Sequence, residues 1–299
     1  MSQFSASEAA LEGFRLVRRH PAAILAWCGV YFLGIMAIAL VMAAVLGPTF
    51  IEFIQNGGLE SGSSEAFAEQ LANSWPAFIL VLLLAMLLMG ILTAAVYRSI
   101  LRPEERSLAY LRIGADEVRL AAVHMLLFLI LMAFVIPINM LILGAMSGVG
   151  GPVLAVAALA LVGVMFWVGV RLCLATPVTF AEHRISLVRT WRLTRGRFWP
   201  LLGMAVLAVI FYVMVWLLVT FLGVVIVGLS GGADVVASEG PPSIGTVIAL
   251  LVSVAIQLLV PTLQVVMIFA PFAIAYQALS GPEDEVPAVP PAGAEPAPT

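Results

Sequence analysis

Residues 201–229 read LLGMAVLAVIFYVMVWLLVTFLGVVIVGL and contain no charged side chain. A helix of about 20 apolar residues crosses the hydrocarbon core of a bilayer, so this run predicts a transmembrane helix. The alternating pattern of a membrane barrel is missing, and a lone strand could not satisfy its backbone in lipid. The whole chain has the same character, because 63% of its 299 residues are hydrophobic and only 10% are charged. It is therefore predicted to be an integral membrane protein.

Six apolar runs are long enough to span a membrane, which predicts an all-α helical bundle. The first run is too long for a cleaved signal peptide, so we expect it to be retained as a span. One membrane domain should cover 1–280, and the proline-rich, acidic segment 281–299 should be a disordered tail. The last run contains Pro261 and Pro271, so we expect it to be kinked or tilted. The runs are 22–46, 77–97, 120–143, 153–170, 201–229 and 246–279.

The basic residues predict the orientation of the spans. All fourteen are arginines, and they lie before the first run, between the second and third, and between the fourth and fifth. The positive-inside rule places these segments, both termini included, in the cytoplasm. The use of Arg without Lys, beside abundant Ala and Gly, is typical of a GC-rich bacterium, so we expect the bacterial inner membrane. The three groups are Arg15, Arg18 and Arg19; Arg98, Arg102, Arg106, Arg112 and Arg119; and Arg171, Arg184, Arg189, Arg192, Arg195 and Arg197.

Each arginine-rich segment precedes a pair of spans and contains a related string. These strings are Phe14-Arg15-Leu16, Leu111-Arg112-Ile113 and Trp191-Arg192-Leu193. We therefore predict amphipathic helices on the cytoplasmic surface and, as a hypothesis, a threefold repeat of one surface helix followed by two spans. The first such helix would begin at a capping box over 5–8, and the second would cover 108–118.

The residues from Arg171 to Pro177 and on to Glu182, followed by 187–199, resemble a family of bacterial polytopic membrane proteins. That family is similar to the membrane domain that precedes the catalytic domain in some glycerophosphodiester phosphodiesterases. The resemblance implies an all-helical membrane module without catalytic residues of its own. The catalytic barrel of those enzymes has no counterpart in this sequence, so we expect no phosphodiesterase activity.

The third arginine-rich segment is the leading candidate for a binding site. Its six arginines are opposed by a single acid, Glu182, and two tryptophans lie among them. Guanidinium groups beside interfacial tryptophans suit anionic lipid headgroups, although the same arginines also serve to set topology. The candidate headgroup residues are Arg184, Arg189, Arg192, Arg195, Arg197, Trp191 and Trp199.

Four polar residues within the spans suggest a different function. Asn139 lies in the third run, and Ser253, Gln257 and Gln264 lie in the sixth. Polar groups in lipid are costly, so they could line the path of a small-molecule or lipid transporter. They could equally hydrogen-bond between helices and hold the bundle together.

Enzymatic sites are not indicated. The string 228–232 matches the G-x-S-x-G nucleophile motif, but His20, His124 and His183 lie toward the opposite side of the membrane, about 30 Å away. There is no metal-binding motif, no Walker lysine, and no Cys-x-x-Cys spacing for Cys28 and Cys173. We therefore expect a non-enzymatic protein without a cofactor or a metal. Its partners would be membrane lipids, together with a protein partner or a second copy, and no nucleic acid.

Overall fold

Long α-helices dominate the computed structural model, which describes residues 6–55, 69, 72–105, 107–148, 150–229 and 244–280. Six of these helices are long and apolar enough to cross a membrane, and each contains one predicted run. The described residues contain no strand, so the prediction of an all-α protein with six spans is confirmed. The six are α3 (Pro21–Gln55), α5 (Trp75–Leu101), α6 (Ala115–Met146), α7 (Gly151–Leu172), α10 (Phe198–Leu229) and α11 (Ile244–Leu279).

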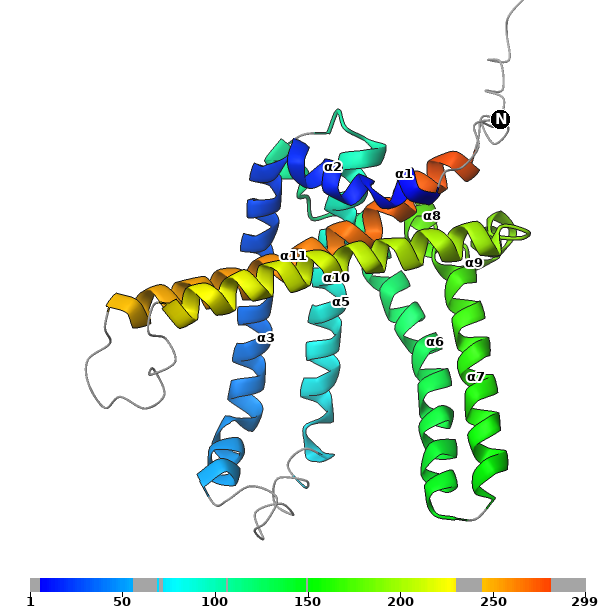
Figure 1. Cartoon of the computed structure of the whole chain (residues 1–299), viewed down its shortest axis with the longest axis horizontal. Coiled ribbons are helices and arrows are strands. Elements are labelled where there is room, and N and C mark those ends of the chain that lie inside the picture. Colours follow the sequence, from blue (N-terminus) through cyan, green and yellow to red (C-terminus); the bar gives the residue numbers. More distant parts are fainter. Residues whose placement is uncertain are drawn as a thin grey trace, which may run out of the picture.

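Consecutive spans pack against each other along most of the chain, including α5 against α6. α3 contacts α5, α6 contacts α7, and α10 contacts α11. The axes of α3, α5, α6 and α7 lie at small angles to one another, whereas α10 and α11 cross them at a steep angle (Figure 1). α11 has 36 residues and continues through Pro261 and Pro271. A helix of that length is about 54 Å long, so it can cross a hydrocarbon layer of about 30 Å while strongly inclined.

The buried part of the bundle is organised around α11, which contacts α2 (Glu12–Arg19), α3, α5, α8 (Ala175–Glu182) and α10. Its residues Val266, Ala270 and Ala273 are fully buried. By contrast, only 6% of the most hydropathic window of α3 is buried, against 39% for α5. The long exposed faces are apolar, as expected for helices that are solvated by lipid chains.

A glycine permits the close approach of α5 and α6. A Cβ at Gly90 would lie 2.6 Å from the carbonyl oxygen of Glu117 and 2.8 Å from the backbone nitrogen of Ala121. Backbone atoms cannot move aside as the end of a side chain can. Only glycine therefore fits this crossing without separating the helices, a common use of small residues between membrane helices.

The second expected surface helix, over 108–118, is not present. Residues Ser107–Tyr110 form a short 3-10 turn, η2, and 115–118 already belong to α6. Leu108, Ala109 and Tyr110 have positive φ angles of 47°, 58° and 65°. This conformation costs roughly 1–2 kcal/mol for each such residue. Side-chain hydrogen bonds to the carbonyls of Ala109 and Tyr110 stabilise the turn against the local helical preference.

The other two arginine-rich segments do contain short helices. α1 (Ala6–Ala10) and α2 pack on the α10–α11 pair, and α8 and α9 (Leu187–Leu193) join α7 to α10.

Three predictions lie outside the described residues: the start of the capping box at Ser5, the nucleophile motif around Ser230, and the tail over 281–299. The threefold repeat remains a prediction.

Candidate functional site

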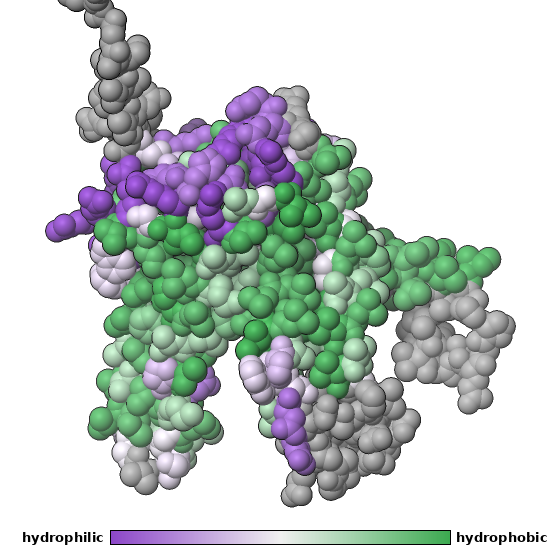
Figure 2. All heavy atoms as spheres, turned by 180° about the vertical axis from the view of Figure 1, so that it is seen from behind, coloured by the Kyte–Doolittle hydropathy of each residue, from purple (hydrophilic) through white to green (hydrophobic). Residues whose placement is uncertain are grey.

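The hydrophilic residues gather at one end of the bundle, above the apolar legs (Figure 2). This arginine-rich end contains the C-terminal end of α5, the N-terminal end of α6, and helices α2, α8 and α9. It therefore combines charged groups from all three arginine-rich segments of the sequence. Three features of this end differ in burial and in chemistry: a buried ion pair, a surface network and an arginine close to two tryptophans.

The buried ion pair joins α5 to α6. Arg98 and Glu117 are 3% and 1% exposed, and Arg98 Nη2 donates to Glu117 Oε1 over 2.5 Å. The Nη1 atom of Arg98 donates to the carbonyl of Tyr110 over 2.6 Å, and its Nε lies 3.4 Å from Glu105 Oε2. Two charges this deep are stable only when they are paired and hydrogen-bonded. Arg98 and Glu117 are therefore structural residues that fix the α5–η2–α6 junction.

A surface network continues from this pair toward α8. Asp116 accepts from Arg119 Nη1 over 2.7 Å, and its Oδ1 lies 2.8 Å from His183 Nδ1. Arg102 reaches the other ring nitrogen of His183 at 2.9 Å and lies over the ring of Phe180, 4.9 Å from its centroid. These arginines therefore already have acidic, imidazole or aromatic partners, which leaves them poorly suited to a ligand.

Arg171, at the end of α7, lies close to two tryptophan rings that contact each other. Its guanidinium carbon lies 5.6 Å from the centroid of Trp167 and 5.5 Å from that of Trp191. The two rings meet edge to face with centroids 5.1 Å apart. Within the described part of the chain, the buried Nε and Nη1 atoms of Arg171 have no hydrogen-bond partner. Thr194 donates to the carbonyl of Arg171 over 3.2 Å, so the turn after α9 is fastened to this site.

The predicted headgroup residues fall into two groups. Arg184 and Arg189 both pair with Glu182, at 3.0 and 3.1 Å, so their charge is largely compensated. The side chains of Arg192, Arg195 and Arg197 are exposed, and the described residues offer them no acidic partner within 4 Å. Trp191 packs on Arg171, whereas Trp199 is 78% exposed. We define the Arg–Trp surface as Arg171, Trp167, Trp191, Arg192, Arg195, Arg197 and Trp199.

No family model, curated protein or solved structure matches this chain. Among the described residues, no three His, Cys, Asp or Glu side chains lie close enough together to hold a metal ion.

The intramembrane polar residues lie on two helices, one on α6 and three on α11, and their hydrogen bonds are mostly local. Asn139, on α6, donates to the carbonyl of Val135 one turn earlier, and Ser253, on α11, donates to that of Ala249. Gln264 accepts a hydrogen bond of 3.3 Å from Tyr212 and so links α11 to α10. The side chain of Gln257 is exposed. The bond between Tyr212 and Gln264 is of the kind that holds a bundle together.

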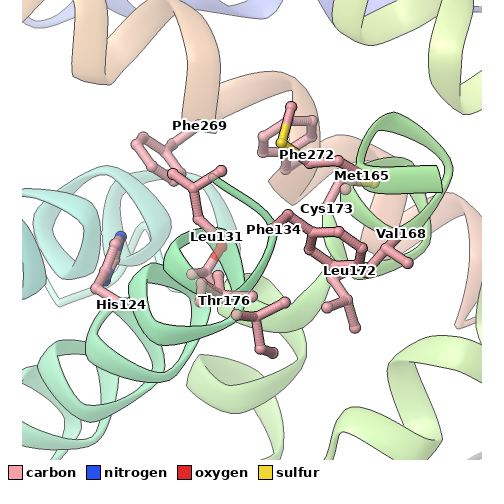
Figure 3. A pocket seen from close by; sticks show the side chains of 13 residues that line it. His124, Leu131, Phe134, Met165, Val168, Leu172, Cys173, Thr176, Phe269 and Phe272 are labelled. Carbon is pink, nitrogen blue, oxygen red and sulfur yellow. The ribbon is translucent and has the colours of Figure 1, made fainter. Parts of the chain in front are cut away.

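Two neighbouring apolar cavities lie between the α6–α7 pair and the α10–α11 pair. The first has a volume of about 340 Å³ and the second about 520 Å³. Figure 3 shows the first, with Phe269 and Phe272 on one side and His124 at its edge. These cavities could not be predicted from the sequence, because their walls come from helices far apart in the chain. Both cavities are lined by Leu131, Met165, Gly169, Cys173 and Phe272.

Proposed function

We propose that this chain is a non-enzymatic protein of the bacterial inner membrane that binds anionic phospholipid headgroups at its Arg–Trp surface. In this proposal the arginine-rich end and both termini face the cytoplasm, as the positive-inside rule predicts. The observation that carries the proposal is the difference in ion pairing between two groups of arginines in the third arginine-rich segment. Arg184 and Arg189 are neutralised by Glu182, while Arg192, Arg195 and Arg197 stay exposed without an acid within 4 Å in the described residues.

Electrostatics and location favour a lipid phosphate as the ligand. Each Arg near an anionic membrane surface contributes about 1 kcal/mol to the attraction, so three uncompensated arginines supply about 3 kcal/mol. Guanidinium groups bind phosphate oxygens in a forked geometry that Lys cannot match. Trp199 is exposed next to Arg197, and tryptophan side chains concentrate at the level of lipid headgroups. Arg171, whose buried Nε and Nη1 atoms have no hydrogen-bond partner among the described residues, adds a further positive charge to the same surface.

The test replaces the three uncompensated arginines together. The variant Arg192→Gln, Arg195→Gln, Arg197→Gln is compared with the wild type in nanodiscs that contain phosphatidylglycerol or cardiolipin in a phosphatidylcholine background. We expect lipid extraction and native mass spectrometry to show at least tenfold less retained anionic lipid on the variant, because about 3 kcal/mol of attraction is lost. Retention on the wild type should also decrease as the salt concentration rises.

A matched control keeps the number of removed charges constant. Arg15, Arg18 and Arg19 form the first arginine group, and Glu12 lies 3.4 Å from Arg15 and 3.6 Å from Arg19. Their triple replacement by Gln removes the same formal charge away from the Arg–Trp surface. If both triple variants lose the same amount of anionic lipid, binding reflects net charge alone and the assigned site is wrong.

A further inference from the structure

The cavities between the α6–α7 and α10–α11 pairs have the properties of a lipid-chain site that opens sideways into the membrane. Their walls are almost entirely hydrocarbon, and five shared residues make them neighbouring parts of one crevice. Several residues that line the second cavity are also exposed on the outer surface, including Phe166 at 63% and Val206 at 49%. The crevice is therefore accessible from the hydrocarbon layer, where its occupant would be dissolved.

One polar atom in this wall distinguishes it from a plain packing defect. His124 Nε2 is buried, and the described residues provide it with no hydrogen-bond partner. The other ring nitrogen, Nδ1, lies 2.8 Å from the carbonyl oxygen of Leu120. Because a carbonyl oxygen only accepts, Nδ1 carries the proton, and in the neutral ring Nε2 presents a lone pair. No carboxylate lines the first cavity, so nothing there compensates a charged imidazolium.

The other polar groups of the wall do not offer this acceptor. The hydroxyl of Thr176 is 2.6 Å from that of Tyr97, and one donates to the other, so neither lacks a hydrogen-bond partner. His124 itself is held in place by Phe269, whose ring meets the imidazole edge to face at 5.7 Å. His124 lies nine residues after the start of α6, or about 14 Å along the helix, and so below the charged surface.

We infer that the crevice binds the hydrocarbon chain of a membrane lipid that carries a free hydroxyl group, and that this hydroxyl donates to His124 Nε2. Diacylglycerols and polyprenols share this chemistry, and each would place its chain against Leu131, Met165 and Phe272. An anionic headgroup does not fit, since none of the described residues that line either cavity is a Lys or an Arg. The site is thus separate from the Arg–Trp surface, and it does not depend on the function proposed there.

The experiment fills the crevice at a position where the backbone leaves room. Gly169 lines both cavities, and a Cβ there would meet nothing within 4 Å, so Gly169→Leu places a side chain in the crevice without a backbone clash. Gly163, on the same helix, has equally open surroundings and lines neither cavity, which makes Gly163→Leu the matched control. Delipidated full-length protein in detergent is titrated with 1,2-dioleoylglycerol and, separately, with a polyprenol, and binding is read by native mass spectrometry. We expect Gly169→Leu to abolish binding and Gly163→Leu to keep it.

A second comparison tests the hydrogen bond itself. The 3-acetyl ester of dioleoylglycerol keeps both chains but lacks the hydroxyl proton, and it should bind the wild type about three- to tenfold more weakly. His124→Phe preserves the ring while removing the acceptor, so this variant should no longer distinguish the two lipids. The inference is overturned if Gly169→Leu binds dioleoylglycerol and the polyprenol as the wild type does. It is also overturned if the wild type does not prefer dioleoylglycerol over its ester.

Discussion

The buried pair of Arg98 and Glu117 gives the sharpest prediction about stability. Glu117→Leu fills a similar volume but leaves the guanidinium of Arg98, only 3% exposed, without its closest counter-charge. Breaking a buried ion pair in this way costs about 3–5 kcal/mol. Arg98 keeps its bond to the Tyr110 carbonyl and its contact with Glu105 at 3.4 Å, so we expect the low end, about 3 kcal/mol.

Unfolding in mixed micelles with increasing SDS, followed by tryptophan fluorescence, measures this loss. Trp27 serves as a local reporter, because its indole donates to the Ala109 carbonyl in the adjoining turn. The double variant Arg98→Met, Glu117→Leu should recover most of the lost free energy, since it removes both charges together. The control variant is Glu12→Gln. It removes ion pairs with the exposed side chains of Arg15 and Arg19, and it should lower the free energy of unfolding by less than about 1 kcal/mol. A Glu117→Leu protein that unfolds within 1 kcal/mol of the wild type would refute the reasoning.

Two further predictions concern helix packing and orientation. Gly90→Ala should destabilise the protein by about 1–3 kcal/mol in the same unfolding assay, because its Cβ would meet the backbone of α6. Gly203→Ala has open space around its Cβ and should change stability by less than about 1 kcal/mol, so equal effects would contradict the proposed α5–α6 contact. A reporter fused after residue 299 should be active only in the cytoplasm, and single cysteines placed within 98–119 should resist membrane-impermeant reagents in intact cells. Periplasmic reporter activity or labelling from outside would reverse the assigned orientation.

The spans were predictable because length and apolarity are local properties of the sequence. A run such as 201–229 must be a helix in lipid whatever surrounds it, and it forms most of α10. The turn over 108–110 was not predictable for the opposite reason. Its apolar spacing favours a helix, but hydrogen bonds from Trp27 and Arg98, which are distant in sequence, hold it in a left-handed conformation. Tertiary contacts of this kind leave no periodic signal.

The candidate sites, too, could be predicted only where the signal is local in the sequence. Sequence composition identified the segment that contains Arg192, Arg195 and Arg197, because six arginines beside one acid are visible as a count. It did not identify the contact of Arg171 with two tryptophan rings, since Trp191 lies on α9 whereas Arg171 and Trp167 lie on α7. The lipid-chain crevice was also missed, because its walls combine α6, α7, α10 and α11 only after folding.

The arginines of this chain perform two physically different tasks that the positive-inside rule treats alike. Arg98 is buried against Glu117 and cannot reach a lipid headgroup without breaking the α5–α6 junction. Arg195 and Arg197 are exposed on the turn that Thr194 fastens to the end of α7. A carboxylate partner therefore decides the role. Where a buried carboxylate is present, as for Arg98, the guanidinium stabilises the fold, and where the described residues provide none at the surface, as for Arg195 and Arg197, the positive charge remains available to phosphate. The proposed headgroup site therefore depends on the exposed arginines of one surface and not on the sum of all fourteen.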